Sequence, residues 1–169
     1  SALNLDCDTA EWAHFVSGSS RYYFAGWGPN ESSAYEVALK IKETSYVTTE
    51  GFQVEQYLHG PFVATEKGTT VTFICPPGLG SDRTTDLIKT VKAVGGYTVG
   101  LIHPENQEVG ALLDRTITLP DCPDLLTPIV YLIPLQLFAY WLSLEQECNP
   151  DVFRLNDPDH LEAKGNYLL

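Results

Sequence analysis

The sequence predicts a three-layer α/β sandwich built around a five-stranded parallel sheet. Short apolar runs bounded by glycine, proline and other turn residues alternate with segments of helical period. This alternation is typical of βαβ units, in which a helix follows each strand and covers one face of a parallel sheet. The chain has 169 residues, of which 44% are hydrophobic, and this is enough for one core but too little for two full-sized domains.

The first part of the chain predicts a helix, a strand and a second helix in that order. A short helix is expected at residues 9–16 and the first strand at residues 22–26. The glycines and the proline of residues 26–29 end the strand, and a helix then runs to about Ser45. Three polar residues can cap the N-terminus of that helix, namely Asn30, Ser32 and Ser33.

Four more strands and two long helices are expected after this helix. The strands fall in short β-prone or apolar runs, at residues 46–49, 71–75, 97–102 and 115–119. Residues 82–93 have helical period. Residues 125–143 predict a long apolar helix, which Pro128 and Pro134 break or kink because proline lacks the backbone N–H group.

Residues 1–150 form a single domain in this interpretation, and residues 151–169 form a C-terminal tail. The segment 149–160 is polar and interrupted by prolines, so it is not expected to join the core. The tail could instead contribute to an active site or to a subunit contact. The chain contains no methionine and begins at Ser1, and we therefore expect it to be a piece of a longer protein.

The charge balance argues against nucleic acid as a partner. Ten Lys and Arg residues against 22 Asp and Glu residues give a net charge of −12, which repels phosphate backbones and anionic lipid surfaces. This charge does not exclude a phosphorylated ligand, because helix N-termini and a few well-placed cations can overcome the overall field.

The chain is expected in the cytoplasm and without a membrane partner. Its four scattered cysteines have no C-x-x-C spacing, which indicates reduced thiols. No apolar stretch of about 18 residues is evident, and Asp6 and Asp8 are not typical of a signal peptide. No metal site or cofactor is expected, because three histidines stand apart with no cysteine nearby: His14, His103 and His160.

A line of charged residues on the helix that ends near Ser45 is the first candidate for chemistry. Glu36, Lys40 and Glu43 stand at positions i, i+4 and i+7, so they share one side of the helix. The other side carries small or apolar residues suited to packing on the sheet: Ala34, Ala38, Ile41 and Ser45. The charges are either a solvated face with ion pairs or, in a cleft, a site where Glu43 moves a proton and Lys40 orients an oxygen.

His59 is the second candidate, because it lies in a predicted turn with Gly60 and Pro61. It follows a polar run, so its imidazole is expected to project from a loop and not to lie in the core. Two interpretations stay open at this point: an ordinary surface histidine, or a catalytic one.

The turn from residue 26 to residue 33 follows a strand and opens a helix, as an anion-binding loop does. It lacks the G-x-G-x-x-G pattern and the lysine of a P-loop, so a purely structural turn is the alternative. Its candidate ligand-binding residues are Gly26, Gly28, Ser32 and Ser33.

Several spaced motifs resemble one known family. They are Gly-Trp-Gly at 26–28, Glu-Val-Ala-Leu-Lys-Ile-Lys-Glu-Thr-Ser-Tyr at 36–46, Thr-Glu-Gly at 49–51, His-Gly-Pro at 59–61, Pro-Leu-Gln-Leu-Phe-Ala-Tyr at 134–140 and Asn-Pro-Asp at 149–151. In this order they resemble the second SIS (sugar isomerase) domain of glutamine:fructose-6-phosphate aminotransferases and related sugar-phosphate deaminases. Agreement of several spaced motifs is more specific than any one of them.

The resemblance implies a flavodoxin-like SIS fold, a sugar phosphate ligand, and pairing either as a homodimer or with a second SIS domain. In such domains the glutamate that matches Glu43 shuttles a proton between C1 and C2 of the open-chain sugar. The histidine that matches His59 assists ring opening, often in the site of a neighbouring subunit. Glu36 and Lys40 match residues that lie near the sugar. The resemblance implies no cofactor.

Two departures from the family pattern limit what the resemblance implies. The phosphate loop of the family, a Ser-x-Ser-Gly-x-Thr run on its first SIS domain, is absent from this sequence. The chain is therefore expected to carry part of a site, as the C-terminal half of a two-SIS protein. The usual tail, Pro-Arg-x-Leu-x-Lys, is replaced at residues 153–160, and Lys164 is out of register with the amine-handling lysine.

The leading hypothesis is a phosphosugar isomerase or aminosugar-phosphate deaminase domain that isomerises a hexose phosphate by proton shuttle. The presence together of Glu36, Lys40, Glu43 and His59 favours an enzyme, because a sensor has no need of a proton shuttle. The alternative is a non-catalytic SIS domain that binds a sugar phosphate for regulation or serves dimerisation.

Overall fold

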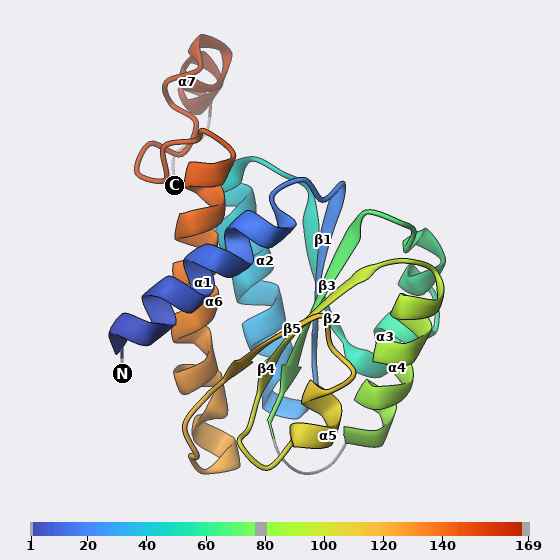
Figure 1. Cartoon of the computed structure of the whole chain (residues 1–169). Coiled ribbons are helices and arrows are strands. Elements are labelled where there is room, and N and C mark those ends of the chain that lie inside the picture. Colours follow the sequence, from blue (N-terminus) through green and yellow to red (C-terminus); the bar gives the residue numbers. More distant parts are fainter. Residues whose placement is uncertain (1, 77–80, 167–169) are drawn as a thin grey trace.

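The computed structural model of the chain describes residues 2–76 and 81–166. Five parallel strands form one sheet in the order β2-β1-β3-β4-β5, with helices on both faces (Figure 1). This order is that of flavodoxin-like, doubly wound sheets. The predicted three-layer sandwich and its five-stranded parallel sheet are confirmed.

The elements have the following bounds. The strands are β1 (Arg21–Gly26), β2 (Thr49–Gln53), β3 (Thr69–Cys75), β4 (Tyr97–Ile102) and β5 (Arg115–Thr118). The helices are α1 (Ala2–Val16), α2 (Glu31–Ser45), α3 (Val54–Leu58), α4 (Ser81–Ala93), α5 (Gln107–Gly110), α6 (Thr127–Glu145) and α7 (Pro158–Lys164). Short 3-10 turns are found at Gly28–Asn30, Pro61–Ala64 and Asp124–Leu126.

Strand β2 is displaced from its predicted position at residues 46–49. Tyr46 has a left-handed backbone with φ of 58° and ends α2, so the chain turns there and the strand begins only at Thr49. Glu50 and Gly51 are weak strand formers, which hid the strand in the sequence. They nevertheless form a strand, because β2 pairs in parallel with β1, beginning with Thr49 opposite Tyr22.

Helix α6 runs unbroken from Thr127 to Glu145, so the predicted break at its prolines is wrong, while a kink there stays a prediction. Pro128 lies in the first turn, where backbone N–H groups have no acceptor within the helix, so its missing N–H group costs no hydrogen bond. Pro134 lies inside the helix and is buried. We attribute the intact helix to the packing of its inner face against the sheet and against α1, which offsets one lost hydrogen bond.

Within the described residues, one segment is long and apolar enough to cross a membrane by length and composition. It is Asp124–Glu145, with a mean hydropathy of 1.6, and it corrects the expectation that no such stretch exists. Part of its apolar content belongs to the core, since Leu135, Phe138 and Leu142 face the sheet and are fully buried.

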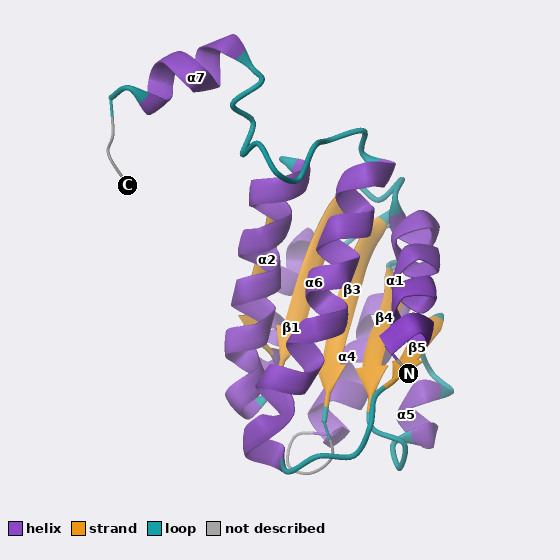
Figure 2. Ribbon diagram, turned by 90° about the vertical axis from the view of Figure 1, so that its left-hand side faces the viewer, coloured by secondary structure: helices purple, strands orange, loops and turns teal. Residues whose placement is uncertain are grey.

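Two hydrophobic clusters fill the space on either side of the sheet. The first lies under α1, α2 and α6, which stand in front of the strands in Figure 2. At its centre the rings of Trp12 and Phe138 stack with centroids 3.7 Å apart. The second cluster lies under α3 and α4 on the opposite face. The sheet is therefore covered on both sides, as a parallel sheet requires.

Asp114, which lies just before β5, connects β4 to α4. Its contacts indicate that the stability of the fold falls at acid pH. Lys92 Nζ lies 2.6 Å from Asp114 Oδ1, and the N–H and the hydroxyl of Thr98 each donate to Oδ2 at 2.8 Å. Burial raises the pKa of Asp114, but the hydrogen bonds from Lys92 and Thr98 outweigh it and hold that pKa below its usual 3.8. The charged form is therefore favoured by folding.

We expect Asp114→Asn to lower the free energy of unfolding at pH 7 by about 1–3 kcal/mol. Because the folded-state pKa is depressed, the wild-type advantage is present above pH 3.8 and disappears as the pH falls through the folded-state pKa. Urea unfolding of both proteins from pH 7 down to acid pH measures this difference. A constant difference between the two proteins across that range would contradict the assignment.

Candidate functional site

The predicted site residues lie at two ends of α2. Gly26, Gly28, Ser32 and Ser33 lie around its N-terminus, at the carboxyl end of β1. Glu43 lies in its last turn, roughly 16 Å further along the helix axis than Ser32 at 1.5 Å per residue. One bound hexose therefore cannot contact both ends, and each end has to be considered as a separate site.

The turn at the N-terminus of α2 is tightly packed. A Cβ atom added at Gly26 would lie 2.1 Å from the carbonyl oxygen of Asn30, and Gly28 has φ of 55°. The Ser32 hydroxyl donates to Pro29 O at 2.7 Å, and the buried Ser33 hydroxyl donates to Asn30 Oδ1 at 3.4 Å. These contacts favour a structural role, and the predicted contacts of this turn with a ligand stay a prediction.

Asn30 does not cap α2 with its side chain, contrary to one expectation from the sequence. It occupies the N-cap position without a side-chain cap bond, and its Nδ2 donates to Thr127 Oγ1 at 2.8 Å. The amide thus joins the start of α2 to the start of α6. Residues 77–80, which follow β3 in the sequence, lie outside the described residues.

We expect Gly26→Ala to lower the free energy of unfolding by about 1–3 kcal/mol, because the new methyl group meets backbone atoms that cannot move away. Gly18→Ala is the matched control, since nothing lies within 4 Å of an added Cβ there. Urea unfolding of the two variants gives the comparison. A Gly26→Ala protein that is as stable as the control but binds no sugar phosphate would instead assign Gly26 to ligand contact.

His59 lies on the surface and apart from Glu43. Its side chain is 78% exposed, and its Nε2 lies 3.5 Å from Glu55 Oε2. Glu55 is also bound by Arg83, whose Nη2 donates to Oε2 at 3.0 Å. Helix α3, which precedes His59, is tied to the first half of α2, where the Tyr35 hydroxyl donates to a Gln56 oxygen at 3.3 Å.

The three charged residues predicted to share one side of α2 are brought together. Lys40 Nζ lies 2.7 Å from Glu43 Oε2 and 3.8 Å from Glu36 Oε1. The hydrogen bond that Lys40 donates to Glu43 is the main reason that the pKa of Lys40 is raised. The opposite side of the helix is buried as predicted, at Ala34, Ala38, Ile41 and Ser45. The side chain of Glu43 is the least exposed of the three, at 25%.

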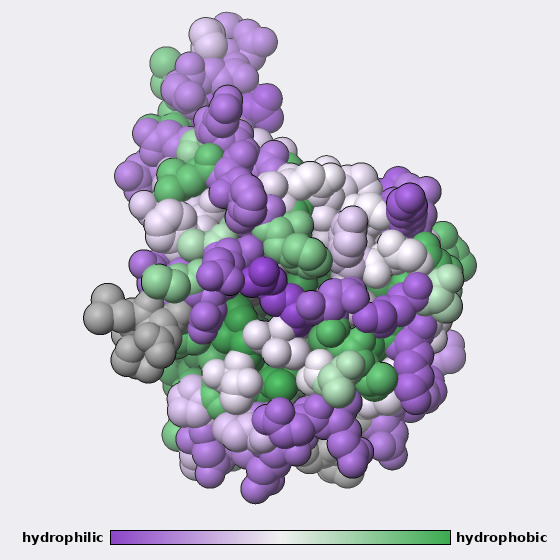
Figure 3. Space-filling view, in the orientation of Figure 1, coloured by the Kyte–Doolittle hydropathy of each residue, from purple (hydrophilic) through white to green (hydrophobic). Residues whose placement is uncertain are grey.

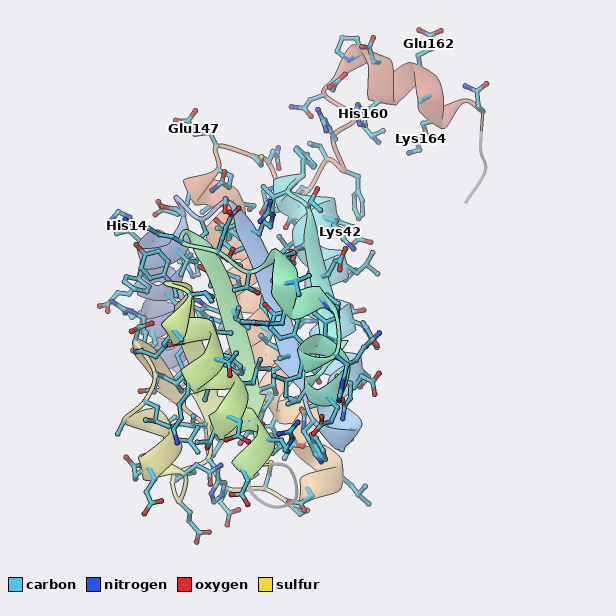
Figure 4. All side chains as sticks on the ribbon, turned by 90° about the vertical axis from the view of Figure 1, so that its right-hand side faces the viewer. His14, Lys42, Glu147, His160, Glu162 and Lys164 are labelled. Carbon is cyan, nitrogen blue, oxygen red and sulfur yellow. The ribbon has the colours of Figure 1, made fainter. Side chains whose placement is uncertain are left out.

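Glu43 lines a pocket of about 330 Å³ between the C-terminal end of α2 and the tail. Figure 4 shows the tail helix α7, with His160 and Lys164, above the end of α2 where Lys42 lies, whereas His14 and Glu147 lie to the other side. The pocket is lined by Lys42, Glu43, Tyr46, Val47, Thr48, Phe153, Arg154 and His160. It combines one carboxylate with two cationic side chains and an imidazole, which suits a ligand that carries both hydroxyl groups and an anionic group.

Sequence reasoning did not single out Tyr46, Arg154 or His160 as site residues. The tail was expected to contribute to a site, but no periodic pattern links it to α2. A weak signal was present, because Arg154 follows Phe153 where the family tail has Pro-Arg. Among the described residues, no group of three or more His, Cys, Asp or Glu side chains is placed to hold a metal ion.

Comparison with known proteins assigns the fold to a family. Residues 16–146 match the SIS domain. The chain belongs to the SIS domain family. This SIS domain is 34% identical over 151 residues to the glutamine–fructose-6-phosphate aminotransferase (isomerizing) of Methanothermobacter thermautotrophicus, covering 89% of this chain and 26% of that protein. The chain thus spans about a quarter of the length of this curated relative.

Solved structures agree with this assignment. The C-terminal domain of the glucosamine-fructose-6-phosphate aminotransferase of Francisella tularensis superposes with a TM-score of 0.82 at 28% identity, over 89% of this SIS domain and 42% of that chain. The tagatose-6-phosphate ketose/aldose isomerase of Escherichia coli superposes with a TM-score of 0.73 at 20% identity, over 85% of this chain and 41% of that chain. The second likeness shows the fold alone.

Proposed function

We propose that this SIS domain is part of a phosphosugar isomerase or aminosugar-phosphate deaminase, in which Glu43 moves a proton between C1 and C2 of an open-chain hexose phosphate. The observation that supports this most is the position of Glu43, in a pocket of about 330 Å³ with Lys40 Nζ at 2.7 Å. A carboxylate poised beside the acidic carbon is what aldose–ketose isomerisation needs.

The proposed step uses Glu43 as base and then as acid. Its carboxylate takes a proton from C1 of the ketose, the electrons of the C–H bond form the C1=C2 double bond, and the C2 carbonyl oxygen takes a proton from water to give the enediol. The carboxyl group then returns a proton to C2, the O1 hydroxyl gives its proton to water, and C1 becomes the aldehyde carbon. Lys40 holds one carboxylate oxygen at 2.7 Å, so the other oxygen is left to face the sugar. Glu36 Oε1 lies 3.8 Å from Lys40 Nζ and helps to hold that ammonium group in place. Between the two transfers the proton on the carboxyl group exchanges with solvent in competition with its return to carbon.

We propose further that residues 1–150 are the SIS domain proper and residues 151–169 a tail, in the C-terminal half of a two-SIS protein of the cytoplasm. Two observations support this: the absence of the Ser-x-Ser-Gly-x-Thr run from the sequence, and the greater length of the relatives. His59 would then serve a different site from the one at Glu43, because α3 is joined to the other end of α2.

The outer face of α6 is the surface that best fits a homodimer or a second SIS domain. Exposed apolar side chains stand along it at positions i, i+4, i+11 and i+15: Ile129, Ile133, Tyr140 and Leu144. This spacing makes one continuous stripe on a helix. Burial of such a stripe against a partner helix removes apolar surface from water, which favours association.

The alternative is a non-catalytic SIS domain that binds a sugar phosphate or only dimerises. Two observations favour it. The sequence contains no Ser-x-Ser-Gly-x-Thr run, and an ion pair such as Lys40–Glu43 is also found on solvated helix faces. Catalysis and sensing differ in one measurable event, the breaking of a C–H bond.

The experiment that tests the proposal is solvent deuterium exchange. The full-length native protein is incubated with fructose 6-phosphate, and separately with glucosamine 6-phosphate, in D₂O and followed by NMR. An isomerase incorporates deuterium at C1 or C2 as the enediol forms and collapses. Binding of either sugar phosphate without any incorporation would support the sensor instead.

A further inference from the structure

Tyr46 connects the end of α2 to the C-terminal tail. Its hydroxyl accepts a hydrogen bond from the backbone N–H of Arg154 at 2.7 Å and donates to the carbonyl of Asn149 at 3.4 Å. The Arg154 guanidinium lies over the Tyr46 ring, 5.3 Å from its centroid. One side chain thus makes three separate contacts with a segment about a hundred positions further along the chain.

The tail adopts a backbone bend that it would not favour on its own. Phe153 and Arg154 have φ of 45° and 58°, in the left-handed region that residues with a side chain rarely occupy. Such a conformation persists only where surrounding contacts hold it. Tyr46 supplies such contacts, and so do bonds within the bend, where the Asp157 N–H donates to the carbonyl of Arg154 at 3.0 Å. Helix α7 itself is exposed, and the tail projects from the rounded body (Figure 3).

The bend brings a guanidinium group and an imidazole to the pocket that contains Glu43. Arg154 and His160 both line it, opposite Lys42 from α2. Asp157 lies between them, with Oδ2 3.4 Å from Arg154 Nε and 3.3 Å from His160 Nδ1. Lys42 and Arg154 balance the charges of Glu43 and Asp157, and the His160 imidazole adds a further group that can donate a hydrogen bond. An anion bound there meets donors from both walls of the pocket.

We propose that Tyr46 is a positioning residue that docks the tail over Glu43, so that Arg154 and His160 bind the anionic group of the ligand. The ligand class, a phosphate ester of a sugar, rests on the proposed function, whereas the anion site itself does not.

The first test is an NMR titration of the wild-type full-length protein with inorganic phosphate and with fructose 6-phosphate. The Arg154 Nε–H and His160 imidazole resonances are expected to shift with a common saturation curve, and those of His14, an exposed histidine at the opposite side of the molecule, to stay in place (Figure 4). Shifts at His14 equal to those at His160 would mean unspecific binding and would overturn the proposal.

The second test uses variants. Tyr46→Phe keeps the ring but removes the hydroxyl, and we expect it to weaken the binding of fructose 6-phosphate by about 2–10-fold. Arg154→Gln is expected to weaken it by about 10-fold or more, because it removes a charged donor. Tyr35→Phe is the matched control, since this tyrosine is on the same helix but bonds to Glu31 and Gln56 and does not contact the tail. It should bind as the wild type does.

The outcomes separate this proposal from the proposed function. If the phosphate-induced shifts at Arg154 and His160 occur but no deuterium is incorporated, the anion site stands and the isomerase assignment fails. If turnover occurs and both Tyr46→Phe and Arg154→Gln keep the wild-type KM, the isomerase assignment stands and the anion site fails. A positioning role predicts a raised KM in Tyr46→Phe with kcat within about twofold of wild type.

Discussion

Glu43→Gln is expected to lower turnover of a hexose phosphate by about 10²–10⁴-fold and to leave its binding nearly unchanged. The amide has almost the shape of the carboxylate and can still accept a hydrogen bond from Lys40, but it cannot take the proton from carbon. Binding and turnover are measured on the same full-length protein, by calorimetry and by the rate of deuterium incorporation.

The control for this variant is Glu50→Gln, which removes an exposed carboxylate on the edge strand β2. It makes the same change in net charge, so an effect of overall charge would appear in both variants. If Glu43→Gln turns over the sugar phosphate as fast as Glu50→Gln does, Glu43 is not the group that moves the proton. Equal loss of binding and turnover would assign it to ligand contact, as the sensor alternative requires.

Phe138→Ala is expected to lower the free energy of unfolding by about 3–5 kcal/mol. The ring is fully buried at the centre of the cluster beneath α1, α2 and α6, stacked on Trp12 at 3.7 Å and close to Phe24. Its removal loses the transfer free energy of the ring and leaves a cavity between helices that cannot close over it. Urea unfolding monitored by circular dichroism gives the change in midpoint.

Phe153→Ala is the matched control, because Phe153 is 60% exposed in the tail. We expect its effect on the unfolding free energy to stay within about 0.5 kcal/mol, as for other surface substitutions. Similar losses for the two variants would mean that the tail is part of the cooperative unit, and that the division between core and tail is wrong.

Much of the sheet could be predicted because its strands are buried on both faces. The strand β4 begins and ends where the apolar run from Tyr97 to Ile102 does, and every residue of β3 is buried. Strand β2 was predicted at the wrong residues because it lies at the sheet edge. There Glu50 and Gly51 are tolerated, and only Thr49 and Phe52 are buried. The position of β2 depends on its pairing with β1, and the sequence around residues 49–53 does not show this pairing.

The candidate site could be predicted only in part, for a related reason. Glu36, Lys40 and Glu43 are neighbours because a helix places i, i+4 and i+7 on one side, and their spacing in the sequence is sufficient to show this. The contact of Tyr46 with Arg154 joins segments that are far apart in sequence and follows from a backbone bend in the tail. Such a contact becomes visible only in three dimensions.

A crystal structure of the full-length protein with fructose 6-phosphate decides whether the sugar binds beside Glu43. We expect the sugar in the pocket between α2 and the tail, with C1 and C2 about 3–3.5 Å from the Glu43 carboxylate. The general rule for open α/β sheets instead places ligands at the carboxyl ends of the strands, near Gly26 and Ser33. A sugar phosphate bound at that edge, with none beside Glu43, would contradict the account.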